Sequence, residues 1–294
     1  MCGIGGIVTF DGSEPARADL KRLADALAHR GPDAEGFFSQ AGMPGIGLAH
    51  RRLSIVDLSH AADHPVTGED RTIQALLNGE IYNYRELRAG LEGRHVFRTQ
   101  GDTESVVHGY EERGDEIVPA LDGMFALALW DGNRRRLLLA RDPFGKKPLY
   151  YWHDTNRFVF ASEIKGLLAV GVPAGLNEKR LGEYLSFGYV PTPETLFAGI
   201  RKVPPASILV VDKDGVHAPR AYWDLEFPPD GSARKVGLDE AAVNKSRTRS
   251  GGCAPSPWAS KATRFSTSAH GQRRWRAIWD PIITRPSPRR TPPT

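Results

Sequence analysis

Short apolar runs dominate the pattern of hydrophobic and polar positions, and most of them have the length and composition of β-strands. They are rich in Val, Ile, Leu and aromatic residues and are bounded by Gly, Pro, Asn or Asp, which is typical of strands that end in turns. The turn signals Asp131-Gly132-Asn133 and Asp214-Gly215 predict hairpins between consecutive runs. The predicted strands are residues 2–10, 36–40, 45–50, 73–77, 95–98, 124–130, 135–141, 149–152, 157–161, 207–212 and 216–223.

Apolar residues recur at helical spacing in several segments between these strands. Leu20, Leu23, Ala24 and Leu27 form one such stripe and predict a helix over residues 16–28. Strands that follow one another through tight turns pair antiparallel, and helices with a single apolar stripe pack outside the sheets. The pattern therefore predicts an α+β fold with antiparallel sheets. The other predicted helices are residues 82–91, 105–112, 163–169 and 178–187.

Composition is typical of a protein from a reducing compartment. The chain has 294 residues, 40% of them hydrophobic, which suffices for one large core or two modest ones. Its two cysteines, Cys2 and Cys253, make no disulfide framework. The sequence shows no apolar run near the roughly 18 residues of a membrane helix, and no basic start followed by an apolar run. We therefore expect a cytoplasmic protein without a membrane partner.

The net charge of +4 suggests a nucleic-acid partner until the charge is located along the chain. Residues 244–294 contain 11 of the 39 Lys and Arg residues, but Asp280 is their single acid among 35. The rest of the chain is therefore acidic. A basic tail on an acidic body does not predict a nucleic-acid-binding enzyme, and we expect no nucleic-acid partner.

Cys2 carries the first candidate chemistry. Removal of Met1, which a small second residue permits, would leave Cys2 with a thiol and a free α-amine. An α-amine titrates at a pKa of about 8 and a thiol at about 8.5, so near neutral pH the amine can accept the thiol proton and generate the reactive thiolate. On position alone, Cys2 could equally be a small apolar strand residue.

Two downstream motifs offer groups that complement a small polar substrate. Arg52 follows the predicted strand over residues 45–50, and an arginine can bind a carboxylate through two parallel hydrogen bonds, although a surface arginine is the simpler interpretation. Asn78 and Gly79 lie where the strand over residues 73–77 is expected to end. An Asn amide and a Gly N–H would supply two donors to an oxyanion, whereas an ordinary Asn-Gly turn is the alternative.

Two further motifs have plain structural interpretations. Asp102 and Thr103 precede a predicted helix and would serve as its N-cap. His29 and Asp33, in a Gly- and Pro-rich turn, would be solvated or capping residues. The sequence contains no Gly-rich phosphate loop of the P-loop kind and no His or Cys pattern with zinc spacing, so it predicts no metal site.

Taken in order, these motifs resemble the class II glutamine amidotransferases. The resemblance covers about residues 1–226 and implies an N-terminal-nucleophile hydrolase fold, an αββα sandwich of two antiparallel sheets with outer helices. Later segments are similar in particular to the glutamine-hydrolysing asparagine synthetases. The motifs that carry the resemblance are Cys2-Gly3-Ile4, residues 29–33 (HRGPD), 52–57 (RLSIVD), 78–83 (NGEIYN), 101–104 (GDTE), 141–151 (RDPFGKKPLYY), 188–193 (GYVPTP) and 202–205 (KVPP).

The resemblance also implies roles. Cys2 would attack the side-chain amide of L-glutamine and form a thioester, with its α-amine as proton shuttle. Asn78 and Gly79 would stabilise the oxyanion, and Arg52 would bind the substrate α-carboxylate. The other implied glutamine-binding residues are Glu80 and Asp102, for the α-ammonium, together with Ile55 and Val56. No cofactor is expected for this step.

The resemblance stops before the ATP-dependent synthetase domain of the family. That domain carries a Ser-Gly-Gly-x-Asp-Ser loop, whereas residues 250–253 (SGGC) are followed by no acid. We therefore expect a glutaminase domain over residues 2–226, a linker and truncated start of the synthetase domain over 227–243, and a basic tail over 244–294 that is disordered or read out of frame.

Three functions remain open from the sequence. The chain would supply the glutaminase half of asparagine synthesis, with ATP and Mg²⁺ required only by a synthetase domain or subunit that accepts the ammonia. Alternatively, it would be a catalytically silent fragment that binds glutamine or a partner. A third alternative is an amidotransferase that delivers ammonia to another acceptor, such as a sugar phosphate. A homodimer is compatible with each.

Overall fold

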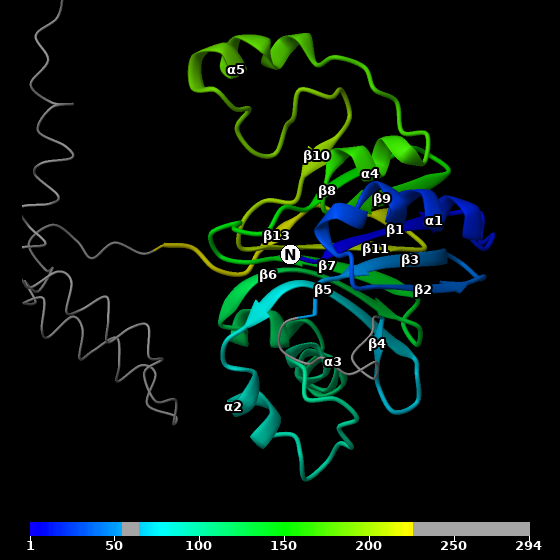
Figure 1. The fold of residues 1–294 in the computed structure, drawn as a ribbon, viewed down its shortest axis with the longest axis vertical. Coiled ribbons are helices and arrows are strands. Elements are labelled where there is room, and N and C mark those ends of the chain that lie inside the picture. Colours follow the sequence, from blue (N-terminus) through cyan, green and yellow to red (C-terminus); the bar gives the residue numbers. More distant parts are fainter. Residues whose placement is uncertain (55–64, 226–294) are drawn as a thin grey trace, which may run out of the picture. The chain divides into compact units, whose positions relative to one another are not determined.

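Two antiparallel β-sheets organise the part of the chain that the computed structural model describes, residues 1–54 and 65–225 (Figure 1). The predicted linker and tail, residues 227–243 and 244–294, lie outside the described residues. Within the described ranges, no helix combines the length and apolar character needed to cross a membrane.

The first sheet has six strands in the order β10-β8-β9-β1-β3-β2. Its strand β1 (Gly3–Thr9) pairs antiparallel with β3 (Gly45–Arg52) on one side and with β9 (Arg157–Ala161) on the other, so the first residues of the chain lie in the middle of the sheet. The remaining strands are β2 (Ala34–Gln40), β8 (Tyr150–His153) and β10 (Arg201–Lys202).

The second sheet follows the order β12-β11-β7-β6-β5-β4, and β13 pairs with β11. Hairpin neighbours lie side by side in it, because β5, β6 and β7 follow one another both in the chain and in the sheet. Its strands are β4 (Val66–Thr67), β5 (Ile73–Ile81), β6 (Gly123–Asp131), β7 (Arg136–Arg141), β11 (Ser207–Asp212), β12 (Gly215–Val216) and β13 (Arg220–Ala221).

Alternation along the strands divides the apolar residues into three layers. In β1, Ile4 and Val8 lie in the core between the sheets together with Leu76 of β5, whereas Ile7 packs outward against Leu20. Outer helices cover both sheets (Figure 1). They are α1 (Arg17–Ala26) and α4 (Ile164–Ala169) on the first sheet, and α2 (Tyr84–Ala89) and α3 (Asp102–Arg113) on the second. The predicted sandwich is confirmed.

The predicted strand over residues 95–98 is wrong, since this segment is an extended loop. Its backbone donors bond to carboxylates instead of a neighbouring strand. The Val96 N–H donates to Glu69 at 2.9 Å, and the Arg98 and Thr99 N–H groups donate to Glu104 at 2.8 and 2.7 Å. Because these side chains satisfy the backbone, no ladder is needed.

We predicted that the strand over residues 73–77 ends before Asn78, but strand β5 continues to Ile81. Gly79 permits this close pairing, because a Cβ at this position would lie 2.0 Å from the Met124 carbonyl oxygen of β6. The Asn-Gly turn is therefore also wrong.

Several predicted elements form with shorter or divided bounds. The predicted strand over residues 216–223 divides into β12 and β13, and the predicted helix over 178–187 consists of a 3₁₀ turn (Glu178–Arg180) and α5 (Leu181–Phe187).

Candidate active site

Cys2 lies directly before the central strand of the first sheet and is partly buried. In the ladder between β1 and β3, Gly3 is opposite Arg51 and Ile4 is opposite His50. One further step of this register places Cys2 opposite Arg52, and partners across an antiparallel pair have Cα atoms about 4.5–5.5 Å apart. The Cys2 thiol donates to the carbonyl of Leu53, the residue after Arg52, with 3.8 Å between Sγ and O.

The period of two along each strand directs Cys2 and Asn78 into the same layer. Cys2 stands two residues before Ile4, and Asn78 stands two residues after Leu76; both apolar residues belong to the core between the sheets. Strands β1 and β5 contact one another across this layer. We infer that Cys2 and Asn78 face each other from opposite sheets.

Asn78 is a buried amide that the surrounding protein does not satisfy. Its side chain is 0% exposed, and within the described residues neither Nδ2 nor Oδ1 has a hydrogen-bond partner. Such a group costs stability, and in native proteins it usually marks a place where a ligand or water completes the bonding. Asn78 is therefore suited to donate to a substrate oxygen.

The backbone N–H of Gly79 points toward the same edge of β5 as that of Ile81. The Ile81 N–H donates to Asp102 at 2.8 Å, on the side of β5 away from β6. Alternate residues of a strand direct their N–H groups to the same side. Strand β4 pairs with this edge at Gln74 and Ala75, so the ladders with β6 and β4 do not use the Gly79 donor.

Charged groups of both signs act on the Cys2 thiol. Arg52, at the end of β3, and Asp102, at the start of α3, are 6% and 8% exposed. Burial raises the pKa of Cys2 above its ordinary value, the Arg52 charge lowers it and the Asp102 charge raises it. Both side chains therefore lie within electrostatic range of the thiol. Glu80, two residues after Asn78 on β5, shares its face of the strand and is half-buried.

The predicted N-cap role of Asp102 is wrong. The N-cap residue is Gly101, and no side chain caps α3. Asp102 instead accepts the Ile81 N–H and so connects α3 to the end of β5. Burial raises the pKa of the Asp102 carboxyl.

The turn with the HRGPD motif holds Cys2 and the end of β3 in place. Arg30 Nε donates to the Cys2 carbonyl at 2.9 Å, and its Nη1 lies 2.7 Å from Glu163 Oε1. Asp33, predicted to be a solvated or capping residue, accepts the Ser54 N–H at 2.9 Å. Gly31 packs so closely that a Cβ would lie 2.4 Å from the Arg51 carbonyl. These positioning roles were not predicted, although charged residues in a Gly-Pro turn were a signal.

The structure thus brings Cys2, Arg52 and Asp102 together at adjoining strand and helix ends, and strand alternation directs Asn78 toward them, with Gly79 and Glu80 on the same stretch of β5. Ile55 and Val56 lie outside the described residues. A thiol beside an unsatisfied amide can carry out acyl transfer. One cation and two carboxylates around it complement a substrate with an α-carboxylate and an α-ammonium.

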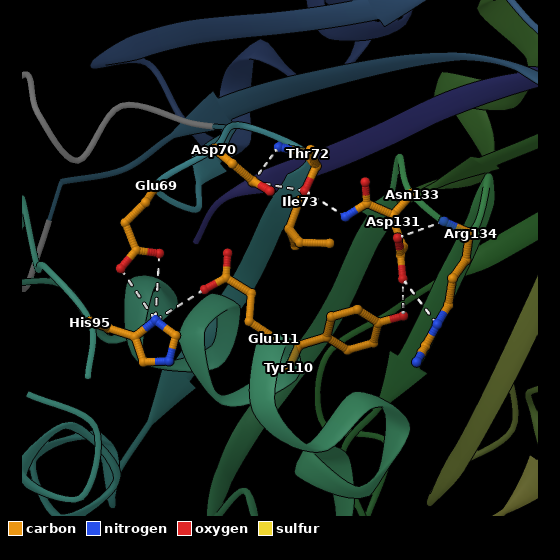
Figure 2. A pocket seen from close by; sticks show the side chains of 10 residues that line it. All are labelled: Glu69, Asp70, Thr72, Ile73, His95, Tyr110, Glu111, Asp131, Asn133 and Arg134. Carbon is orange, nitrogen blue, oxygen red and sulfur yellow. Dashed lines mark hydrogen bonds and ion pairs between the residues drawn. The ribbon is translucent and has the colours of Figure 1, made fainter. Parts of the chain in front are cut away.

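A separate cavity of about 410 Å³ lies between the start of β5 and α3, and its lining side chains are drawn in Figure 2. None of its lining residues is a predicted glutamine-site residue. They are Glu69, Asp70, Thr72, Ile73, His95, Tyr110, Glu111, Asp131, Asn133 and Arg134.

The segment that resembles asparagine synthetases, residues 141–151, begins with two residues that shape a loop. Arg141 donates to the carbonyls of Gly145, Lys147 and Val203 at 2.7–2.8 Å. The Asp142 carboxylate, 1% exposed, accepts the Lys146 and Lys147 N–H groups at 2.9 and 3.0 Å. These contacts indicate a structural role for both side chains.

Comparison with known proteins agrees with this geometry. Residues 1–223 match the family described as glutamine amidotransferase domain. The chain is 38% identical over 237 residues to asparagine synthetase (glutamine-hydrolyzing) 1 of Bacillus subtilis. This alignment covers 78% of this chain and 36% of that protein. It is 36% identical over 239 residues to amidase chry2 of Gibberella zeae, with 78% and 35% covered. The chain therefore spans little more than a third of the length of these relatives.

A solved structure shares the fold at low identity. The glutamine phosphoribosylpyrophosphate amidotransferase of B. subtilis superposes with a TM-score of 0.56 at 19% identity, covering 76% of this chain and 49% of that one. This likeness supports the predicted αββα fold and carries no information on the acceptor of the ammonia.

Proposed function

We propose that this chain, which belongs to the glutamine amidotransferase domain family, hydrolyses L-glutamine to L-glutamate and ammonia with Cys2 as the nucleophile. The observation that carries the proposal is the buried amide of Asn78, which has no hydrogen-bond partner within the described residues and which strand alternation directs into the same layer as Cys2.

The reaction begins with proton transfer from the thiol. Burial raises the pKa of Cys2, so little thiolate exists at neutral pH without a base. Removal of Met1 would make the Cys2 nitrogen a free amine that accepts this proton. The sulfur then bonds to the side-chain carbonyl carbon of glutamine, and the carbonyl electron pair moves to oxygen. Asn78 Nδ2 and the Gly79 N–H would donate to this oxyanion.

Collapse of the intermediate breaks the carbon–nitrogen bond and releases ammonia, which takes its proton from the Cys2 ammonium. Water then attacks the thioester, the amine accepts a proton from that water, and glutamate leaves as the thiol is restored. Arg52 would bind the substrate α-carboxylate, and Glu80 and Asp102 would bind its α-ammonium. Arg30 positions the Cys2 backbone during both steps.

Glutamate release by the purified full-length chain tests the proposal. Intact mass first establishes the fraction of chains that lack Met1, because retained Met1 leaves the Cys2 nitrogen in a peptide bond. We expect Cys2→Ala to reduce glutamate release below about 1% of the native rate, since loss of a catalytic nucleophile commonly costs several orders of magnitude. Cys253→Ala is the matched control and should leave the rate unchanged. Chains without Met1 that bind glutamine but do not turn it over would instead identify a silent binding fragment.

We further propose that the ammonia serves amide synthesis on aspartate by a synthetase domain or subunit outside the described residues. Two observations support this. The chain spans 36% of the B. subtilis synthetase that it resembles, and helix α5 and its flank expose several large apolar side chains that a partner domain could cover. These are Leu181, Tyr184, Leu185, Phe187 and Tyr189.

ATP and Mg²⁺ would be required only by that second domain. With glutamine, aspartate, ATP and Mg²⁺ present, we expect the chain alone to form glutamate and ammonia in equal amounts and no asparagine. Asparagine formation would contradict the restriction of this chain to the glutaminase half-reaction.

A further inference from the structure

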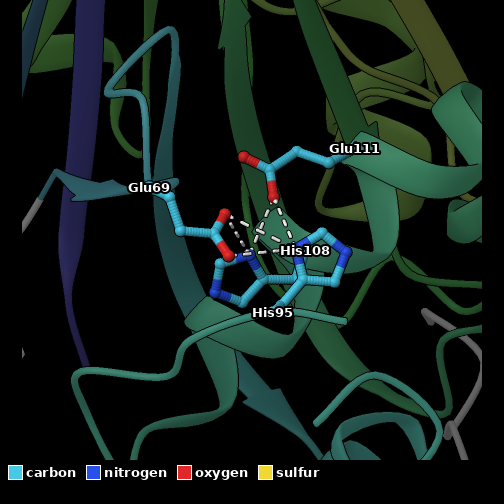
Figure 3. Close-up of side chains that lie close together, drawn as sticks. All are labelled: Glu69, His95, His108 and Glu111. Carbon is cyan, nitrogen blue, oxygen red and sulfur yellow. Dashed lines mark hydrogen bonds and ion pairs between the residues drawn. The ribbon is translucent and has the colours of Figure 1, made fainter. Parts of the chain in front are cut away.

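Two histidines and two glutamates gather beside the C-terminal half of α3, outside the candidate active site (Figure 3). His108 and Glu111 lie on α3, Glu69 lies in the turn between β4 and β5, and His95 lies in the loop before α3. Each offers one ligand atom, and these atoms all lie within 4.8 Å of one another. We call these four side chains the His–Glu cluster.

The distances within the His–Glu cluster fit a four-coordinate cation. His95 Nδ1 lies 3.2 Å from Glu69 Oε1 and 3.4 Å from Glu111 Oε2. His108 Nδ1 lies 2.7 Å from the same Glu111 oxygen and 3.4 Å from Glu69 Oε2. A tetrahedral zinc ion bound at roughly 2.0–2.1 Å separates its ligand atoms by about 3.3 Å. Small side-chain movements therefore suffice to admit a cation.

Each imidazole turns its other nitrogen toward a further carboxylate. His95 Nε2 lies within hydrogen-bond distance of Glu112 Oε1, at 3.3 Å, whereas His108 Nε2 is 3.7 Å from Glu104 Oε1 and has no hydrogen-bond partner within the described residues. Histidines that bind metals almost always direct the second ring nitrogen at a carboxylate, carbonyl or water, which fixes the tautomer and leaves the first nitrogen free to coordinate. Figure 3 shows both Nδ1 atoms facing the Glu69 and Glu111 carboxylates.

Burial and charge also favour a cation at this place. The His108 side chain is 1% exposed and the Glu104 side chain 2%, and with Glu112 four carboxylates surround the two imidazoles. Arg94 pairs with Glu112 at 2.9 Å, and a divalent cation would offset the negative charge of the other carboxylates. The cavity in Figure 2 is lined by Glu69, His95 and Glu111 and connects the His–Glu cluster to solvent.

We propose that the His–Glu cluster binds one divalent first-row transition-metal ion, with Zn²⁺ as the appropriate probe. Two imidazole and two carboxylate ligands suit zinc, and four protein ligands indicate a structural site rather than a catalytic one. The ion would hold the turn before β5 and the loop after α2 against α3. His108, the nearer ligand on α3, follows Asp102 by six residues, about 9 Å along the helix axis, so the ion would not touch glutamine.

Metal content of the full-length chain tests this proposal. After treatment with EDTA and equilibrium dialysis against Zn²⁺, we expect about one ion per chain by atomic absorption. The thermal unfolding temperature should rise with Zn²⁺ concentration, because a ligand that binds the folded state stabilises it. His95→Gln should weaken Zn²⁺ binding by at least about 10- to 100-fold, the loss that substitution of an outer-shell partner alone commonly causes.

Two control variants test whether Zn²⁺ binds elsewhere on the chain. His217→Gln changes an exposed histidine that pairs with Asp212 at 2.8 Å, and it should leave Zn²⁺ binding unchanged. Cys2→Ala should also retain the ion, which excludes the thiol as its ligand and keeps the result independent of glutaminase activity. Binding of fewer than about 0.1 ions per chain, or equal binding by native protein and His95→Gln, would reduce the His–Glu cluster to an ion-pair network.

Discussion

Replacing Asn78 with Ala separates a catalytic amide from a structural one. In the described structure this side chain is fully buried, and neither of its polar atoms has a hydrogen-bond partner. A structural Asn in such a position would be bonded to its surroundings. Loss of a catalytic Asn should therefore remove activity without the loss of stability that normally follows truncation of a buried polar group.

We expect Asn78→Ala to lower kcat but to keep or raise the free energy of unfolding. Loss of one oxyanion donor typically lowers kcat by about 10²–10³-fold, equivalent to about 2.7–4 kcal/mol of transition-state stabilisation. Burial of an unsatisfied amide costs about 1–3 kcal/mol of folding free energy, which the substitution recovers. The cavity left by one amide group offsets roughly 1 kcal/mol of this gain. The free energy of unfolding should therefore stay nearly constant or rise by up to about 2 kcal/mol.

Glutamate release under saturating glutamine gives kcat, and urea unfolding gives the free energy of unfolding. Gln74→Ala is the matched control, because Gln74 lies on the same strand, is 3% exposed and donates to the Arg71 carbonyl at 2.8 Å. It should lose about 2 kcal/mol of stability, about 1 kcal/mol for the hydrogen bond and roughly 1 kcal/mol for the cavity, and retain kcat. If Asn78→Ala instead loses about 2 kcal/mol or more while kcat stays within threefold, the oxyanion role is refuted.

Two further substitutions test the neighbours of Cys2. Burial raises the folded-state pKa of Asp102 above its unfolded value, so the stability contributed by its protonated form is present at low pH and is lost as pH rises through the folded pKa. Asp102→Asn keeps an acceptor for the Ile81 N–H, and its free energy of unfolding in urea at pH 7 should exceed that of native protein, by a difference that decreases toward pH 4. The substitution should also raise the KM for glutamine about 10- to 100-fold. An unchanged KM would contradict the substrate contact. Arg30→Lys loses the bond from Nε to the Cys2 carbonyl and should lower kcat about tenfold with little change in KM, whereas a rise in KM at constant kcat would show that Arg30 does not act through Cys2.

The sheets could be predicted well where pairing is local. The turn Asp131-Gly132-Asn133 joins β6 and β7, which pair directly, and the alternation that produced this prediction depends only on neighbouring residues. The pairing of β1 with β9 could not be predicted in this way. It joins residues more than 140 positions apart, such as Gly5 and Ala161, and no short-range signal specifies it.

The errors arose where distant carboxylates satisfy local backbone groups. Residues 95–98 have strand composition, but Glu69 and Glu104 take the hydrogen bonds that a strand would make. Asp102 occupies a position typical of a helix cap, yet it bonds to Ile81 on another element. In both cases the segment has the predicted local propensity, but a contact with a residue outside the segment determines its structure.

The His–Glu cluster escaped prediction for the same reason. Its members come from a turn, a loop and a helix, and only His108 and Glu111 show a regular spacing, three residues along α3. Zinc motifs that sequence can identify keep their ligands in close pairs. Here the fold of the second sheet brings Glu69 beside α3, so the ligand set exists only in three dimensions.

The positions of the candidate active-site residues follow from the same alternation that builds the core. Ile4, Leu48 and Leu76 are buried between the sheets and fix which face of β1, β3 and β5 turns inward. Two or four residues away from these positions, on the same faces, are Cys2, Arg52, Asn78 and Glu80. A one-residue slip of any of these strands would carry both its apolar residue and its active-site residue to the opposite face. Burial of the apolar core residues therefore also determines which faces of the strands carry the thiol, the amide and the guanidinium.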